Sequence, residues 1–120
     1  MPALDPAALV VRYHAALERL DFAALEAMFA EHAEYRSPGV GGVLSGRSAI
    51  LAAFRRYFAE YPDQRSIDDG VTCLSADTAL AHWRLVATST LTGERSERRG
   101  EERVTFDTDG LIRRVEVRDL

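Results

Sequence analysis

The stretch Ile50-Leu-Ala-Ala-Phe-Arg-Arg-Tyr-Phe-Ala-Glu-Tyr-Pro62-Asp-Gln-Arg-Ser-Ile67 marks the change from helix to strand in this chain. Proline cannot continue a helix, so Pro62 ends the helix that precedes it. After Pro62 the apolar positions follow strand-like spacing. The buried side of the helix before it is predicted to carry Ile50, Leu51, Phe54, Tyr57, Phe58 and Tyr61, which recur at helical spacing.

Two further helices are predicted nearer the N-terminus. Asp5 can cap the first, and Pro6 suits its first position because the N–H that proline lacks is not needed there. Asp21 can cap a second, shorter helix. The apolar positions of the two helices are Leu9, Val10, Tyr13, Ala16, Leu17 and Leu20, and then Phe22, Leu25, Met28 and Phe29.

A strand-like piece over residues 33–37 leads into Pro38 and the glycine-rich loop 39–42, and the third helix is predicted to begin near Ser45 or Gly46. Later strands are predicted near 64–75, 78–91, 95–107 and 111–119, with turns between them. Asp68-Asp69-Gly70 interrupts the first of these and indicates a β-bulge. Helices followed by hairpin-connected strands predict one α+β domain over 1–120, with the helices on one face of an antiparallel sheet.

The composition excludes several classes of protein. The chain has 120 residues, a formal net charge of -4 and a pI near 5.3, which argue against a broad nucleic-acid-binding surface. Cys73 is the only cysteine, so an intrachain disulfide and a cysteine-rich metal site are excluded. No apolar run is long enough to span a membrane, and the N-terminus lacks a secretory signal pattern. A cytoplasmic protein is expected.

Most other charged positions have a simple interpretation. The arginine pairs Arg98-Arg99 and Arg113-Arg114 alternate with glutamates and are interpreted as solvated faces of mixed charge. His14 and His32 fall on or near polar helix faces and receive no functional role. The histidines lack the spacing of a zinc-binding helix, and neither a metal nor another cofactor is expected.

His82 and Arg84 lie two apart in the most apolar stretch, Thr78-Ala-Leu-Ala-His-Trp-Arg-Leu-Val-Ala-Thr88, and therefore share one face of a strand. The alternation within this strand alone favours burying the odd positions, which include Trp83 and Leu85. In the next strand the even positions, Val104 among them, are the apolar ones. The loop between the strands decides whether these two phases agree.

Residues that face each other across a hairpin lie on the same side of the sheet. A three-residue loop over 91–93, with Gly93 in the left-handed conformation, pairs Glu102 with His82. A two-residue loop would instead place Glu101 or Arg103 beside Arg84. The three-residue loop is preferred. It predicts that His82, Arg84 and Glu102 gather on the helix side.

The same register leaves Trp83 and Leu85 on the far face of the sheet. A protein normally covers such an apolar face with a partner. A homodimer through the outer sheet face, centred on Trp83 and Leu85, is therefore expected.

The order of elements resembles the nuclear transport factor 2-like superfamily, which includes the SnoaL-like cyclases and the ketosteroid isomerases. The resemblance spans nearly the whole chain and implies a cone, in which a curved antiparallel sheet wraps three N-terminal helices around an internal pocket. Many members pair through the outer sheet face. The segments that carry the resemblance are Val11-Arg-Tyr-His-Ala-Ala-Leu17, Asp21-Phe-Ala-Ala-Leu-Glu-Ala-Met-Phe-Ala-Glu-His-Ala-Glu-Tyr-Arg-Ser-Pro38, Leu44-Ser-Gly-Arg-Ser-Ala-Ile50 and Phe106-Asp-Thr-Asp-Gly-Leu-Ile112.

The resemblance to the ketosteroid isomerases is partial. Tyr13 matches the tyrosine that donates to the developing oxyanion, and Glu102 matches the second donor, a protonated aspartate in those enzymes (a worked case in general accounts of pKa tuning). The position of the catalytic base holds Ser37. A serine hydroxyl without an activating partner cannot act as a general base near neutral pH, so steroid isomerisation by that mechanism is not expected.

The other chemistries of the superfamily are also incomplete here. Arg84 could match the arginine of an Asp-Arg-Asp epoxide-hydrolase set, but Val86 and Val117 stand where its acids would be. Aldol cyclases of this superfamily carry an aspartate or a histidine on the last strand. The only counterpart in this sequence is Asp119, which lies at the chain end.

The predicted function is binding of a small, largely apolar molecule in the pocket, with isomerase, cyclase or hydratase chemistry as one possibility. Glu102 or His82 would move a proton, while Tyr13 and Arg84 would stabilise an oxyanion. The alternative is a non-catalytic binding or dimerisation module in which Arg84 and Glu102 form a structural ion pair. Ligand contacts are expected from Tyr35, Ser37, Phe54, Phe58, Val86, Val104, Val117 and Asp119.

Overall fold

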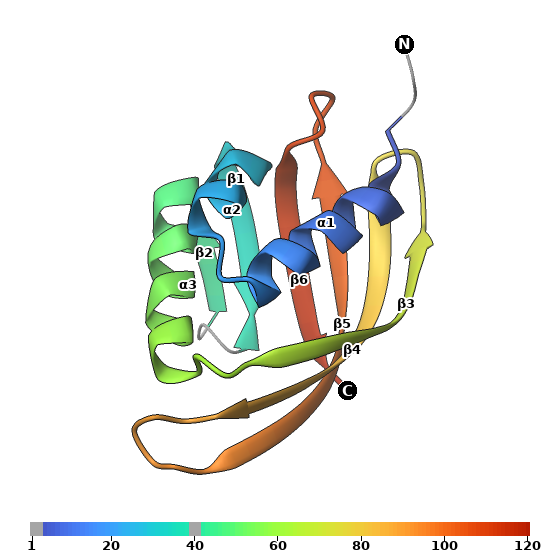
Figure 1. Cartoon of the computed structure of the whole chain (residues 1–120). Coiled ribbons are helices and arrows are strands. Elements are labelled where there is room, and N and C mark those ends of the chain that lie inside the picture. The colour runs from blue at the N-terminus through green and yellow to red at the C-terminus, as the bar shows by residue number, and fades with distance from the viewer. Residues whose placement is uncertain (1–3, 39–41) are drawn as a thin grey trace.

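The computed structural model describes residues 4–38 and 42–120, which form three helices and six strands (Figure 1). The α+β prediction is confirmed. The elements in chain order are α1 (Pro6–Glu18), α2 (Phe22–Met28), β1 (Phe29–Ser37), β2 (Gly42–Ser45), α3 (Arg47–Glu60), β3 (Arg65–Cys73), β4 (Thr78–Thr88), β5 (Arg95–Phe106) and β6 (Ile112–Asp119).

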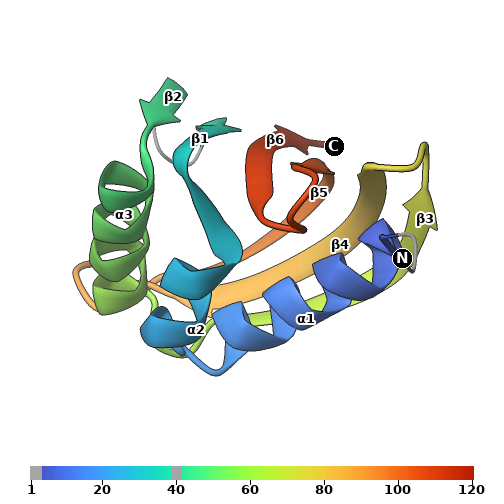
Figure 2. The same cartoon turned by 90° about the horizontal axis from the view of Figure 1, so that it is seen from above.

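The strands form a single curved sheet in the order β2-β1-β6-β5-β4-β3, and the helices lie on its concave side (Figure 2). Every neighbouring pair is antiparallel except β1 and β6, which run parallel. The sheet is therefore mixed, where a purely antiparallel one was predicted. Within the described residues, no helix has the length and apolar character needed to cross a membrane.

The helix boundaries follow the predicted signals. The Asp5 carboxylate accepts a hydrogen bond from the Ala8 backbone N–H at 3.1 Å, and Asp21 accepts one from Ala24 at the same distance. These bonds satisfy amide groups that have no partner inside the helix. Gly46 precedes α3 with a φ of 95°, which a residue without Cβ adopts readily. The helix stops at Glu60, two residues before Pro62.

Two elements near the middle of the chain differ from the prediction. Phe29, expected on the second helix, begins β1 and is fully buried. Residues 39–41 of the predicted glycine-rich loop lie outside the described residues, but Gly42–Ser45 just after them pair with β1 as β2. A strand of this length is too short to show a periodic pattern in the sequence.

A hydrophobic core fills the space between the helices and the concave face of the sheet. Its largest fully buried side chains come from α1, α2, α3 and three strands, and they are Tyr13, Phe29, Leu25, Ile50, Ile112, Val10, Val104 and Val115. Burying side chains of this size contributes about 1.5–3 kcal/mol each relative to leaving them exposed.

The register of β4 and β5 differs by one residue from the preferred prediction. The Ser89 N–H donates to the Glu94 carbonyl, so the hairpin loop consists of the four residues 90–93 rather than three. Gly93 has the expected left-handed conformation, with a φ of 75°. The longer loop pairs Glu102 with Ala81, and His82 faces Glu101 instead. Because side chains alternate between faces, this one-residue difference turns the whole of β4 over.

His82 and Arg84 consequently lie on the outer face of the sheet, and the prediction that they face the helices is wrong. His82 contacts Glu101 at 3.2 Å, and Arg84 pairs with Asp69 at 3.0 Å. Both side chains are exposed, and the predicted ion pair between Arg84 and Glu102 does not form. The alternation within β4 alone, which favoured burying the odd positions, is confirmed.

The odd positions of β4 face inward, so the predicted dimer surface around Trp83 and Leu85 is wrong. Leu85 is buried and Trp83 is half-buried, and both line a pocket under the helices. They cannot form an apolar patch on the outer face of the sheet. Val86 shares the outward phase of His82 and Arg84.

The predicted β-bulge is present in β3. The register with β4 shifts between Asp68 and Gly70, which leaves Asp69 as the extra residue. The two aspartates point to opposite faces, since Asp68 reaches His14 on α1 and Asp69 reaches Arg84 on the outer face, and the bulge lets Asp68 and Val71 both face inward. This is the usual effect of a bulge, which re-aims side chains on one strand.

Candidate functional site

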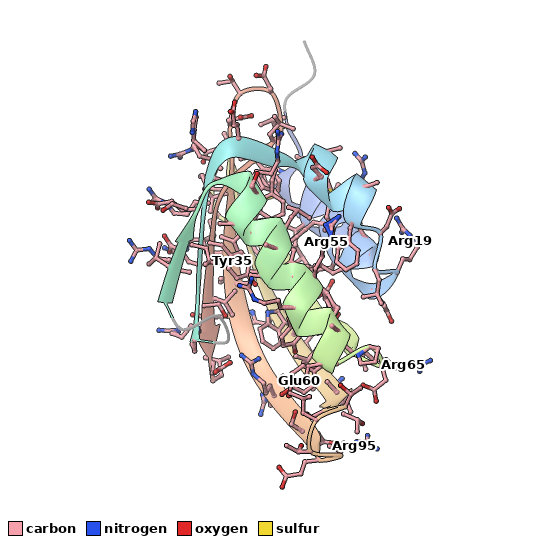
Figure 3. All side chains as sticks on the ribbon, turned by 90° about the vertical axis from the view of Figure 1, so that its left-hand side faces the viewer. Arg19, Tyr35, Arg55, Glu60, Arg65 and Arg95 are labelled. Carbon is pink, nitrogen blue, oxygen red and sulfur yellow. The ribbon has the colours of Figure 1, made fainter. Side chains whose placement is uncertain are left out.

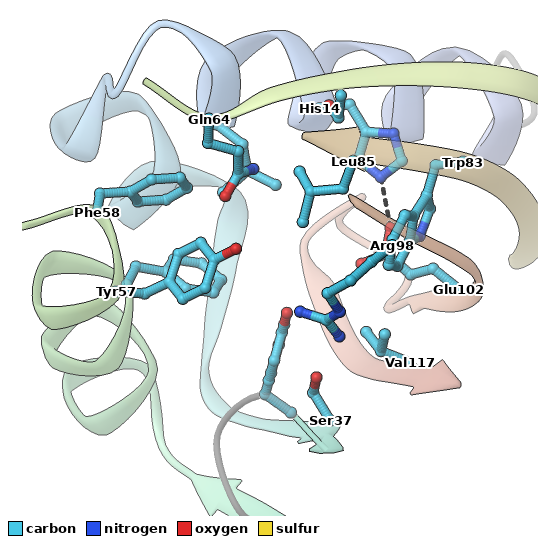
Figure 4. Close-up of a pocket in the computed structure, with 14 residues that line it drawn as sticks. His14, Ser37, Tyr57, Phe58, Gln64, Trp83, Leu85, Arg98, Glu102 and Val117 are labelled. Atoms are coloured by element: carbon cyan, nitrogen blue, oxygen red, sulfur yellow. Dashed lines mark hydrogen bonds and ion pairs between the residues drawn. The ribbon is translucent and has the colours of Figure 1, made fainter. Parts of the chain in front are cut away.

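A pocket of about 110 Å³ lies between α1, α3 and the inner face of the sheet (Figure 4). Most of its wall is apolar, so a bound molecule would lose contact with water over much of its surface. The apolar lining consists of Leu17, Phe54, Phe58, Trp83, Leu85 and Val117. The polar lining consists of His14, Tyr35, Ser37, Tyr57, Gln64, Ser66, Arg98 and Glu102.

Half of the predicted site residues line this pocket: Glu102, Tyr35, Ser37, Phe54, Phe58 and Val117. The others lie elsewhere, and the structure does not bring them together with these. His82, Arg84 and Val86 follow the outward phase of β4, while Val104 is fully buried in the core. Asp119 is exposed at the end of β6, where it accepts a hydrogen bond from Arg98 at 2.7 Å.

The main polar feature of the pocket is a chain of three side chains from α1, β3 and β5. The Nε2 of His14 bonds to the Glu102 carboxylate, and its Nδ1 bonds to Asp68 at 2.8 Å. His14 and Glu102 retain only 8% and 4% of their exposed surface, whereas the Asp68 side chain keeps 25%. The chain therefore runs from the pocket wall to the surface of the molecule.

These contacts determine the charge of His14. Burial by itself lowers the pKa of an imidazole. The charge of Glu102 opposes this, together with hydrogen bonds to Asp68 and Glu102, and the balance raises the pKa of His14 to about 10. His14 is then an imidazolium at neutral pH and donates from both ring nitrogens. A buried carboxylate such as Glu102 is tolerated because this charge and its hydrogen bond compensate it.

Tyr13 occupies a different position from the one predicted. It is 1% exposed, packs edge-on against Phe29 with ring centroids 5.7 Å apart, and does not line the pocket. Its hydroxyl has no hydrogen-bond partner among the described residues. Burial, then the charge of Glu102, raises the pKa of Tyr13 well above its ordinary value, so the hydroxyl stays protonated.

Arg98 provides a second positive charge in the pocket, a role that was predicted for Arg84. Its guanidinium projects into the space between Ser37 and Tyr57 (Figure 4). The same group lies 5.9 Å from the centre of the Trp83 ring. Burial raises the pKa of the Tyr35 and Tyr57 hydroxyls, and Arg98 partly offsets this in both cases. The tyrosines are therefore neutral donors beside a fixed cation.

Two signals in the sequence could have identified the missed residues. Val10, His14 and Leu17 are spaced i, i+4 and i+7, which places His14 on the buried face of α1. The even positions of β5 had already been assigned inward, and Arg98 is one of them. Asp68 gives no such signal, because its direction depends on the bulge.

The described part of the chain contains no group of three or more His, Cys, Asp or Glu side chains placed to hold a metal ion. The functional groups that line the pocket are a buried carboxylate, an imidazolium, a guanidinium and several hydroxyls.

Comparison with known proteins identifies the family. The SnoaL-like domain family matches residues 10–115, and the chain belongs to that family. A comparison with curated proteins finds no significant sequence match.

Solved structures share the nuclear transport factor 2-like fold. A protein of this type from Burkholderia thailandensis is 26% identical, with a TM-score of 0.84 over 100% of this chain and 92% of that one. A Mycobacterium tuberculosis protein in complex with estradiol-17beta-hemisuccinate is 19% identical, with a TM-score of 0.82 over 95% and 93%. The epoxide hydrolase/cyclase-like enzyme SalBIII, which acts in pyran ring formation in salinomycin, is 18% identical, with a TM-score of 0.82 over 93% and 88%.

Proposed function

We propose that the pocket binds a small, largely apolar molecule that carries a carbonyl or similar oxygen, and that Glu102 exchanges a proton with it. The observation that carries this proposal is the buried Glu102 carboxylate, which is hydrogen-bonded to His14 in the wall of a pocket whose accessible surface is mostly apolar. Titratable groups held in such surroundings are typical of sites of proton transfer.

Each polar side chain of the pocket has its own role in this reaction. Glu102 removes a proton from a carbon next to the carbonyl and later returns it. His14 holds the carboxylate in place and supports its negative charge. Arg98, with the neutral hydroxyls of Tyr35 and Tyr57, stabilises the charge that develops on the carbonyl oxygen. Ser37 adds a further polar group to the pocket wall.

The size of the pocket limits the ligand. Pockets for drug-sized molecules usually measure about 300–1,000 Å³, and this one measures about 110 Å³. A compact monocyclic molecule is the best match to the pocket alone. The relatives solved with a steroid ester, designed to bind 17-OHP or acting in pyran ring formation support oxygen-bearing, mostly apolar ligands as the class.

A non-catalytic binding protein is the second candidate, and one observation favours it. Both ring nitrogens of His14 already have carboxylate partners, so the three residues also make sense as a structural network that holds α1 on the sheet. In this alternative the pocket binds its ligand without changing it. The structural ion pair of the alternative is then His14 with Glu102, in place of the predicted pair of Arg84 with Glu102.

The exchange of α-protons for deuterium separates the two candidates. Cyclohexanone in D2O is incubated with the protein, and exchange is followed by NMR while Trp83, the only tryptophan, reports binding through its fluorescence. We expect the wild-type protein to accelerate exchange and Glu102→Gln to lose about 100-fold or more of that acceleration.

Glu101→Gln is the matched control, since Glu101 lies on the outer face of the sheet beside His82 and Arg118. It should retain the wild-type exchange rate. Equal exchange by wild-type protein and Glu102→Gln would contradict proton transfer by Glu102. Quenching of Trp83 without any exchange would favour the non-catalytic binding protein.

A further inference from the structure

A second cavity adjoins the pocket on the side of α3. It measures about 430 Å³ and lies between α3, β2 and the beginning of β5. Two side chains, Tyr57 and Arg98, line both cavities, so they form the wall between them. The remaining lining residues of this outer groove are Leu44, Ala53, Arg56, Glu60, Tyr61 and Ser96.

The wall between the two cavities consists of side chains that can move. Arg98 is held by Asp119 at 2.7 Å, by a hydrogen bond with Tyr57 and by its contact with the Trp83 ring. A guanidinium has five N–H donors, and the bond to Asp119 uses only one of them. A rotamer change of Arg98 that breaks these contacts would join the two cavities without any movement of the backbone, and it would leave donors for a ligand.

The charges of the outer groove favour an anion. Arg56 is exposed on α3, and Arg98 lies at the inner end of the groove. Glu60, the one acid among the described residues that line the groove, accepts a hydrogen bond from the Ser89 hydroxyl at 2.7 Å. Asp119 pairs with Arg98, whereas Arg56 has no acidic partner among the described residues, so Arg56 is available to a carboxylate or sulfonate.

We propose that the ligand is an amphipathic anion that spans both cavities. Its apolar end lies in the pocket against Trp83 and Phe54, and its acidic group lies between Arg98 and Arg56 in the outer groove. The two cavities together fall within the size range of sites for drug-sized molecules, which the pocket alone does not reach. The inference deepens the proposed function, since it rests on ligand binding in the pocket and specifies the class of ligand.

Two fluorescent probes of nearly the same shape test this assignment. 1-Anilinonaphthalene-8-sulfonate carries a negative charge, and N-phenyl-1-naphthylamine is its neutral counterpart. Binding to the full-length protein is measured by calorimetry and by quenching of Trp83. We expect the sulfonate to bind about tenfold more tightly than the neutral probe at low salt, and the difference to shrink as salt is added.

Three substitutions locate the anionic group. Arg56→Gln should weaken sulfonate binding about three- to tenfold and leave the neutral probe unaffected. Arg55→Gln is the matched control, because the neighbouring Arg55 projects toward α2 and lies over the Phe22 ring at 5.0 Å (Figure 3). Asp119→Asn releases Arg98 and should strengthen sulfonate binding.

Equal affinities of the two probes, or equal effects of Arg56→Gln and Arg55→Gln on the sulfonate, would overturn the proposal. These outcomes leave proton exchange by Glu102 untouched. Conversely, if Glu102→Gln exchanges protons as well as the wild type, the charge selectivity of the outer groove can still hold, so the two proposals fail separately.

Discussion

The ring of Trp83 lies directly over Gly100, its partner in the adjacent strand. A Cβ added at Gly100 would stand 2.6 Å from two atoms of the indole ring and 3.0 Å from the Arg118 carbonyl oxygen. No real Cβ makes contacts this close. The glycine thus makes room for the side chain that forms part of the pocket wall and that contacts Arg98.

Gly100→Ala is therefore expected to displace Trp83 and to reduce the free energy of unfolding by about 1–3 kcal/mol, as overpacking does elsewhere. Denaturant unfolding gives the stability, and a shift in the emission of Trp83 reports the displacement. Gly70→Ala in β3 is the matched control, because nothing lies within 4 Å of a Cβ at that position. If both variants show the wild-type emission, the ring does not occupy the space over Gly100.

The raised pKa of His14 predicts a pH dependence of stability. The ordinary pKa of histidine near 6.5 applies to the unfolded chain, and that of folded His14 is about 10. The stabilisation by the imidazolium is therefore complete below about pH 6.5 and is lost as the pH rises toward 10. Urea unfolding between these limits should show a steeper loss of stability for the wild type than for His14→Gln.

His32→Gln serves as the control in that experiment, since His32 is exposed on β1. It should keep the wild-type slope of stability against pH. A His14→Gln protein with the same slope as the wild type would show that His14 is not protonated between its two carboxylates.

Asp68 and Asp69 are adjacent in the chain but should affect His14 very differently. Asp68→Asn removes the negative charge at Nδ1 and should lower the pKa of His14, because the bond to Asp68 is one of the causes that raise it. Asp69→Asn removes a charge that pairs with Arg84 on the outer face and should leave the titration of His14 unchanged. NMR titration of the imidazole distinguishes them. Identical titration curves would contradict the bulge geometry.

Tyr13→Phe should stabilise the ligand-free protein. The Tyr13 hydroxyl is buried and has no partner among the described residues, and an unsatisfied buried polar group is unfavourable by about 1–3 kcal/mol. Replacing it with a hydrogen of nearly the same shape should raise the free energy of unfolding by about 1 kcal/mol. Thermal and urea unfolding measure the change. A loss of stability would indicate that a buried water satisfies the hydroxyl.

Local features of the sequence predicted the elements of the fold well. The capping residues Asp5 and Asp21, the stop at Pro62 and the bulge at 68–70 all act within a few residues, and each lies where the sequence placed it. The parallel pairing of β1 with β6 joins opposite ends of the chain and has no local signal.

The site was less predictable because its composition depended on one turn. The loop over 90–93 has one residue more than predicted. Trp83 and Leu85 therefore lie on the inner face, where His82 and Arg84 had been expected. The even positions of β5 face inward, as predicted, and Glu102 therefore lines the pocket. Homodimer formation and a cytoplasmic location stay predictions.

The bulge in β3 has a consequence for how this strand tolerates changes in length. Inward positions are even before it, as at Ser66 and Asp68, and odd after it, as at Val71, which packs on the core. Asp69 is the extra residue that joins the two phases, so deleting it would give a regular strand in which Ser66, Asp68 and Val71 still face inward. A one-residue deletion at the bulge would therefore remove only Asp69 and its ion pair with Arg84 on the outer face, while the bond of Asp68 to His14 and the inward position of Val71 would remain.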